Sequence, residues 1–167
     1  MGRACFQPTC FLAGLCCECQ WLEAGVRGVS TAPSDRVPAA AAMGFARGQA
    51  VQELGWDADV DDELRAGIQD EVGDEFVDEA VEAVDCVLLW WRDEDGDLAD
   101  GLMDALRDLD ERGRVWLMTP KVGRDGYVEA TDITEAALAA GLALANSAAV
   151  SASWQAHKLV RPKGSRR

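Results

Sequence analysis

The stretch Val84-Asp85-Cys86-Val87-Leu88-Leu89-Trp90-Trp91 decides the fold of this chain. Its residues are apolar at nearly every position, and apolar and polar side chains hardly alternate. This pattern is typical of a strand that is buried on both of its faces. Such a strand normally lies inside a parallel sheet with helices on either side. We therefore expect an α/β fold of three layers, with this strand at the centre of the sheet.

The strand ends abruptly in the acidic run Arg92-Asp93-Glu94-Asp95-Gly96-Asp97. In open α/β sheets, ligands bind where the chain leaves the carboxyl ends of the strands. The ends of two further expected strands, 49–54 and 114–119, should lie at the same edge. The residues that follow these three strands are predicted to border a candidate ligand crevice: Gly55, Trp56, Asp57, Trp91, Asp93 and Lys121.

Strands and helices alternate along the rest of the folded region. Helical spacing and capping residues predict helices at 59–72, 97–112 and 132–140. Their expected caps are Asp59, Asp97, and Thr131 or Asp132, and their expected ends are Gly73, Gly113 and Gly141. A short strand is expected at 75–77, and strands 142–150 and 156–161 should pair as an antiparallel hairpin. The order predicts one three-layer α/β domain with right-handed crossovers, a mostly parallel sheet and a C-terminal antiparallel hairpin.

The two ends of the chain look different from this domain. Residues 1–42 carry no sustained periodicity and finish in the run Pro38-Ala39-Ala40-Ala41-Ala42, so we expect a disordered extension. The folded domain is then 43–163, and 164–167 form a basic tail. Five of the six cysteines lie within the first nineteen residues without the spacing of a zinc site, which favours adventitious thiols over a metal site.

The charge of the chain is concentrated in its middle. The formal net charge is −14 over 167 residues, and the segment from Glu53 to Glu111 holds 23 acidic residues against three arginines, a net charge of −20. Such a surface repels nucleic acid, so we expect no nucleic-acid partner. It is either a solvated surface or a docking face for a basic protein. Because no segment approaches the roughly 18–20 apolar residues of a membrane span, we expect a cytoplasmic protein without membrane contact.

Several runs of the chain form a specific pattern: Gly48–Asp57, Val87–Asp93, Val115–Gly126, Trp154 and Leu159–Lys163. This pattern resembles an actinobacterial family of uncharacterised proteins that is catalogued as domain of unknown function 3052. The resemblance covers about residues 45–163, and it implies fold and membership but no activity. Members of that family usually begin shortly before the first strand. This leads to the hypothesis that residues 1–28 come from an upstream start assignment.

The order of elements is also similar to the carboxyl half of Rossmann-like methyltransferases. In those enzymes, a glycine-rich loop after the first strand lets the backbone approach adenosylmethionine. The corresponding loop here reads Gly55-Trp56-Asp57-Ala58-Asp59-Val60-Asp61. It keeps one glycine and places an indole and three aspartates near a cofactor's own negative groups. We therefore expect no bound cofactor.

Other chemical motifs are weak. The run Asp93–Asp97 has the acidic spacing of a calcium loop, but its glycine stands at the wrong position, so we expect no metal. His157 is the only histidine, which excludes a site built from several of them. Lys121 could neutralise an anionic ligand or pair with Asp93 or Asp125. Cys86, inside the buried strand, is expected to act as a small apolar side chain.

Two functions of different class remain open from the sequence. The favoured one is a non-catalytic Rossmann-like module that acts through protein–protein contacts on an acidic face, with no catalytic residue. The alternative is a sensor that binds a small ligand in the crevice, or a degenerate enzyme that depends on adenosylmethionine or a nucleotide.

Overall fold

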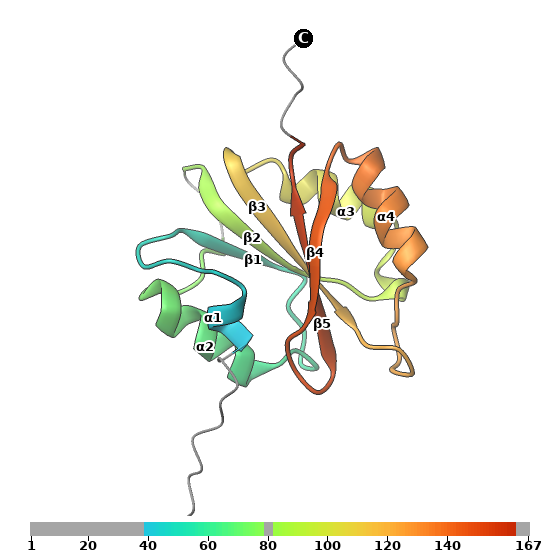
Figure 1. The fold of residues 1–167 in the computed structure, drawn as a ribbon, viewed down its shortest axis with the longest axis horizontal. Helices are drawn as coiled ribbons and strands as arrows, with labels where there is room; N and C mark the ends of the chain where they lie inside the picture. The colour runs from blue at the N-terminus through green and yellow to red at the C-terminus, as the bar shows by residue number, and fades with distance from the viewer. Residues whose placement is uncertain (1–38, 79–81, 163–167) are drawn as a thin grey trace, which may run out of the picture. The chain divides into compact units, whose positions relative to one another are not determined.

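The computed structural model describes residues 39–78 and 82–162, in which five strands form one sheet (Figure 1). The strands are β1 (Val51–Leu54), β2 (Val84–Trp90), β3 (Leu109–Pro120), β4 (Ala143–Ala149) and β5 (Trp154–Val160), in the order β1-β2-β3-β5-β4. β1, β2 and β3 are mutually parallel, and β5 runs antiparallel to β3 and β4. The predicted α/β class is confirmed. β3, rather than β2, holds the central position of the sheet.

Helices cover both faces of this sheet (Figure 1). They are α1 (Ala39–Ala42), α2 (Asp62–Val72), α3 (Leu98–Ala105) and α4 (Ala130–Ala139), together with the short 3-10 turn η1 (Asp93–Asp95). One apolar core joins α1 and α2 to the sheet, and a second joins α3 and α4 to it. β2 contributes to both, because Trp90 lies in the first core and Leu89 in the second. The predicted burial of this strand on its two faces is therefore confirmed.

The start of α2 differs from its predicted start. Asp61 is the N-cap, and its side chain accepts a hydrogen bond from the Leu64 amide at 2.9 Å. Asp59 was expected to cap the helix, but its carboxylate binds Arg92 instead. Gly73 ends the helix with a left-handed φ of +77°, as predicted. A side chain that binds elsewhere in the fold cannot cap its own helix, and this explains the shift.

The predicted helix from Asp97 to Arg112 is wrong at its end. Asp97 caps α3 as expected, and its carboxylate accepts from the Ala99 amide at 2.8 Å. The helix stops at Ala105, however, and Leu109 already belongs to β3, where it is the register partner of Val84. The helical spacing of Leu109 is therefore coincidental. Gly113, the expected helix end, lies inside β3.

Three smaller differences concern other elements. α4 begins at Ala130 after Glu129, without a side-chain cap from Thr131 or Asp132. The strand expected at 75–77 is reduced to one bridge between Val77 and Gln52. Ala39–Ala42, expected to be disordered, form α1.

Four predictions concern residues outside those that the structure describes. They are the disordered extension before residue 39, the thiols of the first nineteen residues, the start assignment for 1–28 and the basic tail 164–167. Within the described ranges, no helix has the length and apolar character needed to cross a membrane.

Candidate functional site

The carboxyl ends of β1 and β2 form a switch point of the sheet. α2, which follows β1, packs on one face, and α3, which follows β2, packs on the other. In open α/β sheets such a point leaves a crevice where ligands bind. The site residues predicted from the sequence all follow β1, β2 or β3. Whether they can bind a ligand therefore depends on which side chains lie in this crevice.

A side chain of the chain itself lies at this switch point. Arg92 directly follows Trp91 at the end of β2, and its side chain is only 10% exposed. Its guanidinium donates to the Gly55 carbonyl oxygen at 2.9 Å and forms an ion pair with the Asp59 carboxylate. It also lies 5.2 Å from the centre of the Trp154 ring, above it. Arg92 thus connects the loop after β1 to β5.

The acidic neighbours of Arg92 stabilise its charged form. Burial opposes the charged form, but hydrogen bonding to Asp59 and the charges of Asp59 and Asp95 outweigh this effect and hold the pKa of Arg92 above its usual value. The Arg92 amide donates to the Asp95 carboxylate at 2.8 Å, which fixes the backbone at the same point. Sequence analysis missed Arg92, because an arginine beside an acidic run looks like a solvated ion pair.

Gly55, the one glycine kept in the loop, is required by the sheet. It has a φ of +70°, and a Cβ at this position would lie 2.1 Å from the Trp90 carbonyl oxygen. No side chain fits that gap. The contact between the ends of β1 and β2 therefore accounts for Gly55 without any ligand.

Trp56 and Asp57 lie on the outside of the same loop. The Trp56 side chain is 57% exposed, and the Arg65 guanidinium lies 6.0 Å from the centre of its ring. The Asp57 carboxylate accepts a hydrogen bond from the neighbouring Ala58 amide at 2.6 Å. Both residues face solvent instead of the crevice.

Lys121 lies beside the turn between β4 and β5. Its Nζ donates to the Ser151 carbonyl oxygen at 2.5 Å, and its amide donates to the Ser153 carbonyl oxygen at 2.9 Å. Within the described residues, neither Asp93 nor Asp125 forms an ion pair with it, so the predicted pairing is wrong. The ammonium group satisfies a turn carbonyl that would otherwise lack a donor.

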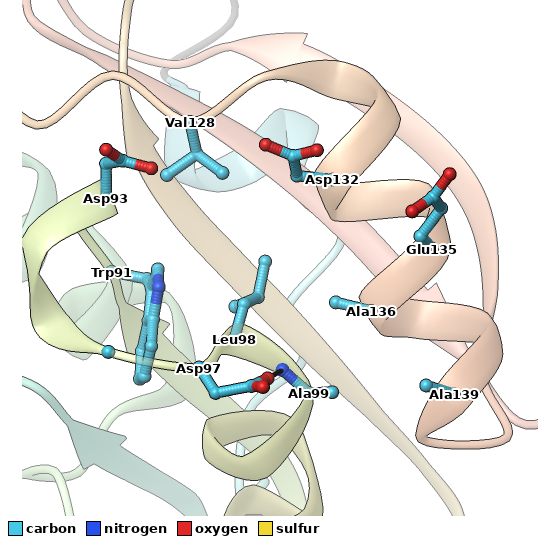
Figure 2. A pocket seen from close by; sticks show the side chains of 11 residues that line it. Trp91, Asp93, Asp97, Leu98, Ala99, Val128, Asp132, Glu135, Ala136 and Ala139 are labelled. Carbon is cyan, nitrogen blue, oxygen red and sulfur yellow. Dashed lines mark hydrogen bonds between the residues drawn. The ribbon is translucent and has the colours of Figure 1, made fainter.

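Trp91 and Asp93 line a pocket of about 400 Å³ between α3 and α4, which we call the acidic pocket (Figure 2). Trp91 is half-buried and packs on α3, where a Cβ at Gly101 would lie 2.3 Å from its ring. The complete lining is Trp91, Asp93, Gly96, Asp97, Leu98, Ala99, Val128, Asp132, Glu135, Ala136 and Ala139. Of the six predicted site residues, the structure brings these two together here.

The acidic pocket combines apolar walls with four carboxylates. Asp93 comes from η1, Asp97 from the start of α3, and Asp132 and Glu135 from α4. Figure 2 shows Trp91 and Asp93 on one side and the two α4 carboxylates on the other. Sequence analysis treated Asp132 only as a possible helix cap. The spacing of three residues between Asp132 and Glu135 places them on one face of α4, and this is the signal that could have identified them.

The acidic residues between Glu53 and Glu111 do not lie on a single face. Asp62 and Glu63 belong to α2 on one side of the sheet, and Asp100 and Asp104 belong to α3 on the other. A further group occupies the loops after β1 and β2. We call this group the acidic rim, and it consists of Asp57, Asp59, Asp93, Glu94, Asp95 and Asp97. Asp85 of β2 and Asp110 and Glu111 of β3 are also exposed, so the expected single acidic face is corrected to a rim, two helix surfaces and the beginnings of two strands.

His157 is a buried structural residue on β5. Its Nδ1 lies 2.9 Å from the Ser147 hydroxyl oxygen, and its Nε2 lies 3.1 Å from the Thr119 hydroxyl oxygen. Burial lowers the pKa of His157 from its usual value, because these partners do not compensate for the lost hydration of an imidazolium.

Acid is therefore expected to weaken the fold through His157. The unfolded chain binds the proton more readily than the folded one, so this contribution to stability is complete above the ordinary histidine pKa of about 6.5 and is lost as pH falls through the lowered value. Urea unfolding of the wild type and of His157→Gln, measured at neutral and at mildly acidic pH, checks this. The stability difference between them should change in favour of His157→Gln on acidification. An unchanged difference would contradict the buried neutral imidazole.

Comparison with known proteins identifies relatives of the whole described region. The family described as protein of unknown function (DUF3052) matches residues 40–163. The uncharacterized protein Rv2239c of Mycobacterium tuberculosis H37Rv is 49% identical over 122 residues, which cover 72% of this chain and 77% of that protein. The uncharacterized protein Mb2263c of Mycobacterium bovis gives the same identity and coverage.

Solved structures with a similar fold include methyltransferases. The mitomycin 7-O-methyltransferase MmcR has a TM-score of 0.53 at 11% identity, over 75% of this chain and 53% of that one. The pyocyanin biosynthetic protein PhzM has a TM-score of 0.50 at 13% identity, over 70% of this chain and 51% of that one. At such identities the likeness concerns the fold alone. It confirms the methyltransferase-like architecture predicted from the order of elements.

Proposed function

This chain belongs to the DUF3052 family of proteins of unknown function, and we propose that it is a non-catalytic module that binds a basic partner protein through its acidic rim. The observation that carries the proposal is the position of Arg92. A Rossmann-like fold that binds a small ligand needs room at the switch point. Here the Arg92 side chain lies at that point and bonds to Gly55 and Asp59.

Displacing Arg92 to admit a ligand would be costly. The Gly55 carbonyl and the Asp59 carboxylate would both lose a charged donor, and such hydrogen bonds contribute about 1.5–3 kcal/mol each. An incoming carboxylate or phosphate would then meet the Asp59 carboxylate. The contacts of Arg92 therefore stabilise the loops of the rim and leave this crevice poorly suited to a cofactor.

The surface around the crevice has the chemistry of a protein contact. Trp56 is exposed next to Asp57, and large exposed aromatic side chains often anchor protein interfaces. Val122, on the loop after β3, is 76% exposed. The carboxylates of the rim, which include Asp57 beside Trp56, speed the encounter with a basic partner and discriminate against acidic ones.

Removing the anchor and one charge from the rim is expected to release the partner. In affinity capture from a mycobacterial lysate, the wild type should retain a basic protein at low salt and lose it at high salt, because salt screens exposed charges. The double variant Trp56→Ala/Asp57→Asn should weaken binding by at least about 2 kcal/mol, or roughly thirtyfold.

The matched control alters the same kinds of residue away from the rim. Met103→Ala/Asp70→Asn also removes one exposed apolar side chain and one exposed aspartate, and it should bind like the wild type. If the amount of captured partner changes neither with salt nor with the rim substitutions, the proposal is contradicted. A rise in the melting temperature of the wild type with adenosylmethionine would also contradict it, since a ligand that binds only the folded state stabilises it.

A further inference from the structure

The acidic pocket differs from the rest of the acidic surface in being hollow and apolar inside. Leu98 and Val128 are almost fully buried in its walls, and Ala136 and Ala139 of α4 form the opposite side. Its volume of about 400 Å³ is in the range of sites that take up a complete side chain or a small ligand. The apolar walls can therefore accommodate a hydrocarbon stem, which a purely solvated surface cannot.

The negative charge of the acidic pocket is not balanced by a basic side chain in the lining that the structure describes. Among the described residues, no arginine or lysine lines the pocket, and none forms an ion pair with Asp93, Asp132 or Glu135. Asp97 is partly engaged, because its carboxylate caps α3. Carboxylates on both sides of an apolar hollow raise the local preference for a cation. A side chain with an apolar stem and a cationic head satisfies both requirements.

Trp91 and the pocket carboxylates favour a guanidinium over an ammonium head. Its ring is held against α3 by the contact at Gly101, while part of it remains exposed to the pocket (Figure 2). Planar guanidinium groups stack flat on tryptophan faces and are found there more often than ammonium groups, and they bind carboxylates with two parallel hydrogen bonds, which an ammonium group cannot form. The same fold pairs Arg92 with Trp154 at 5.2 Å and Arg114 with Phe45 at 5.4 Å, and it also places the Lys158 ammonium 5.8 Å from the centre of the Trp116 ring, so the choice of arginine rests on the two parallel hydrogen bonds to a carboxylate.

We infer that the acidic pocket receives an arginine side chain of the partner protein. The inference rests on the proposed function and gives the partner a chemical signature, an exposed arginine that projects from a basic segment. The stem lies against Leu98 and Val128, the head faces Trp91, and the α4 carboxylates Asp132 and Glu135 close over it.

A short alanine-based peptide with one arginine tests the pocket directly. Titration into isotopically labelled protein should shift the backbone amide resonances of residues 97–99 and 132–139. The peptide with citrulline in place of arginine has the same shape without the charge and should give no shift. The lysine peptide should bind more weakly than the arginine peptide. Equal binding of the arginine and citrulline peptides, or shifts confined to other regions, would overturn the inference.

Two variants connect these shifts to the pocket chemistry. The double variant Asp132→Asn/Glu135→Gln should lower the affinity for the arginine peptide about fivefold. The control Asp100→Asn/Asp104→Asn removes the same charge from exposed positions of α3 and should leave that affinity unchanged. Ala139→Lys places a cation in the pocket near the end of α4, where helices tolerate it, and should abolish the shifts. Binding that survives Ala139→Lys would overturn the inference even if the other variant folds poorly.

The partner assay separates this inference from the function on which it rests. If Trp56→Ala/Asp57→Asn releases the partner and Asp132→Asn/Glu135→Gln does not, the pocket inference is wrong and the rim proposal stands. If neither releases it, both are wrong.

Discussion

Replacing Gly55 with alanine is expected to destabilise the fold by about 3–5 kcal/mol, the sum of backbone strain and overpacking. The φ of +70° is unfavourable for alanine, and the added Cβ would lie 2.1 Å from the Trp90 carbonyl oxygen. To relieve that overlap, the ends of β1 and β2 must separate, and Arg92 would lose its bond to the Gly55 carbonyl. Urea unfolding followed by circular dichroism measures the loss.

A second glycine provides the control for this experiment. Gly48 has a similar φ of +80°, but nothing lies within 4 Å of the position of an added Cβ. Gly48→Ala should therefore show the backbone penalty alone, about 1 kcal/mol. If Gly55→Ala is no more damaging than Gly48→Ala, the tight contact between β1 and β2 does not exist.

Replacing Arg65 with methionine is expected to cost about 3–5 kcal/mol, because it leaves a buried carboxylate without its partner. The Glu53 side chain is only 6% exposed, and two nitrogens of Arg65 bind it at 2.6 Å each. The hydrogen bond to Glu53 holds the pKa of Arg65 above its usual value despite partial burial. Chemical unfolding at neutral pH gives the change in stability.

The double variant Glu53→Gln/Arg65→Met separates the charge from the packing. Glutamine keeps an oxygen for the Trp90 indole N–H, which donates to Glu53 at 2.9 Å, but carries no charge. The double variant should therefore be more stable than Arg65→Met alone, by about 1–3 kcal/mol. Equal stability of the two would mean that the uncompensated charge of Glu53 is not the source of the loss.

The elements that sequence predicts well are those that local patterns specify. The run from Val84 to Trp91 identifies β2 because its burial on two faces leaves no polar position in the middle. Gly73 and Asp97 mark their helix ends because their roles depend only on near neighbours. The end of α3 was predicted wrongly because Leu109 satisfies the helical spacing, yet pairs with Val84 across the sheet.

The candidate site is less accessible to sequence because its central contact is long-range. Arg92 binds Asp59 and Gly55, which lie 33 and 37 residues earlier in the chain. No local sequence pattern indicates which of the many aspartates pairs with this arginine. Trp91 and Asp93 were found because they follow a recognisable strand. Asp132 and Glu135 join them only through the packing of α4 beside α3, which depends on the tertiary fold.

The position of β5 has a consequence for synthesis of the protein. β5 is the last strand among the described residues, but it lies between β3 and β4, and β4 has no other neighbour in the described sheet. Chains emerge from the ribosome amino end first. Until β5 has emerged as far as Val160, β4 lacks its partner and one edge of β3 is unpaired. Apolar residues of β3 that are buried in the folded protein are then also exposed. The nascent protein must therefore carry an unpaired strand edge until β5 has emerged, a state that exposes it to misassociation or to chaperones.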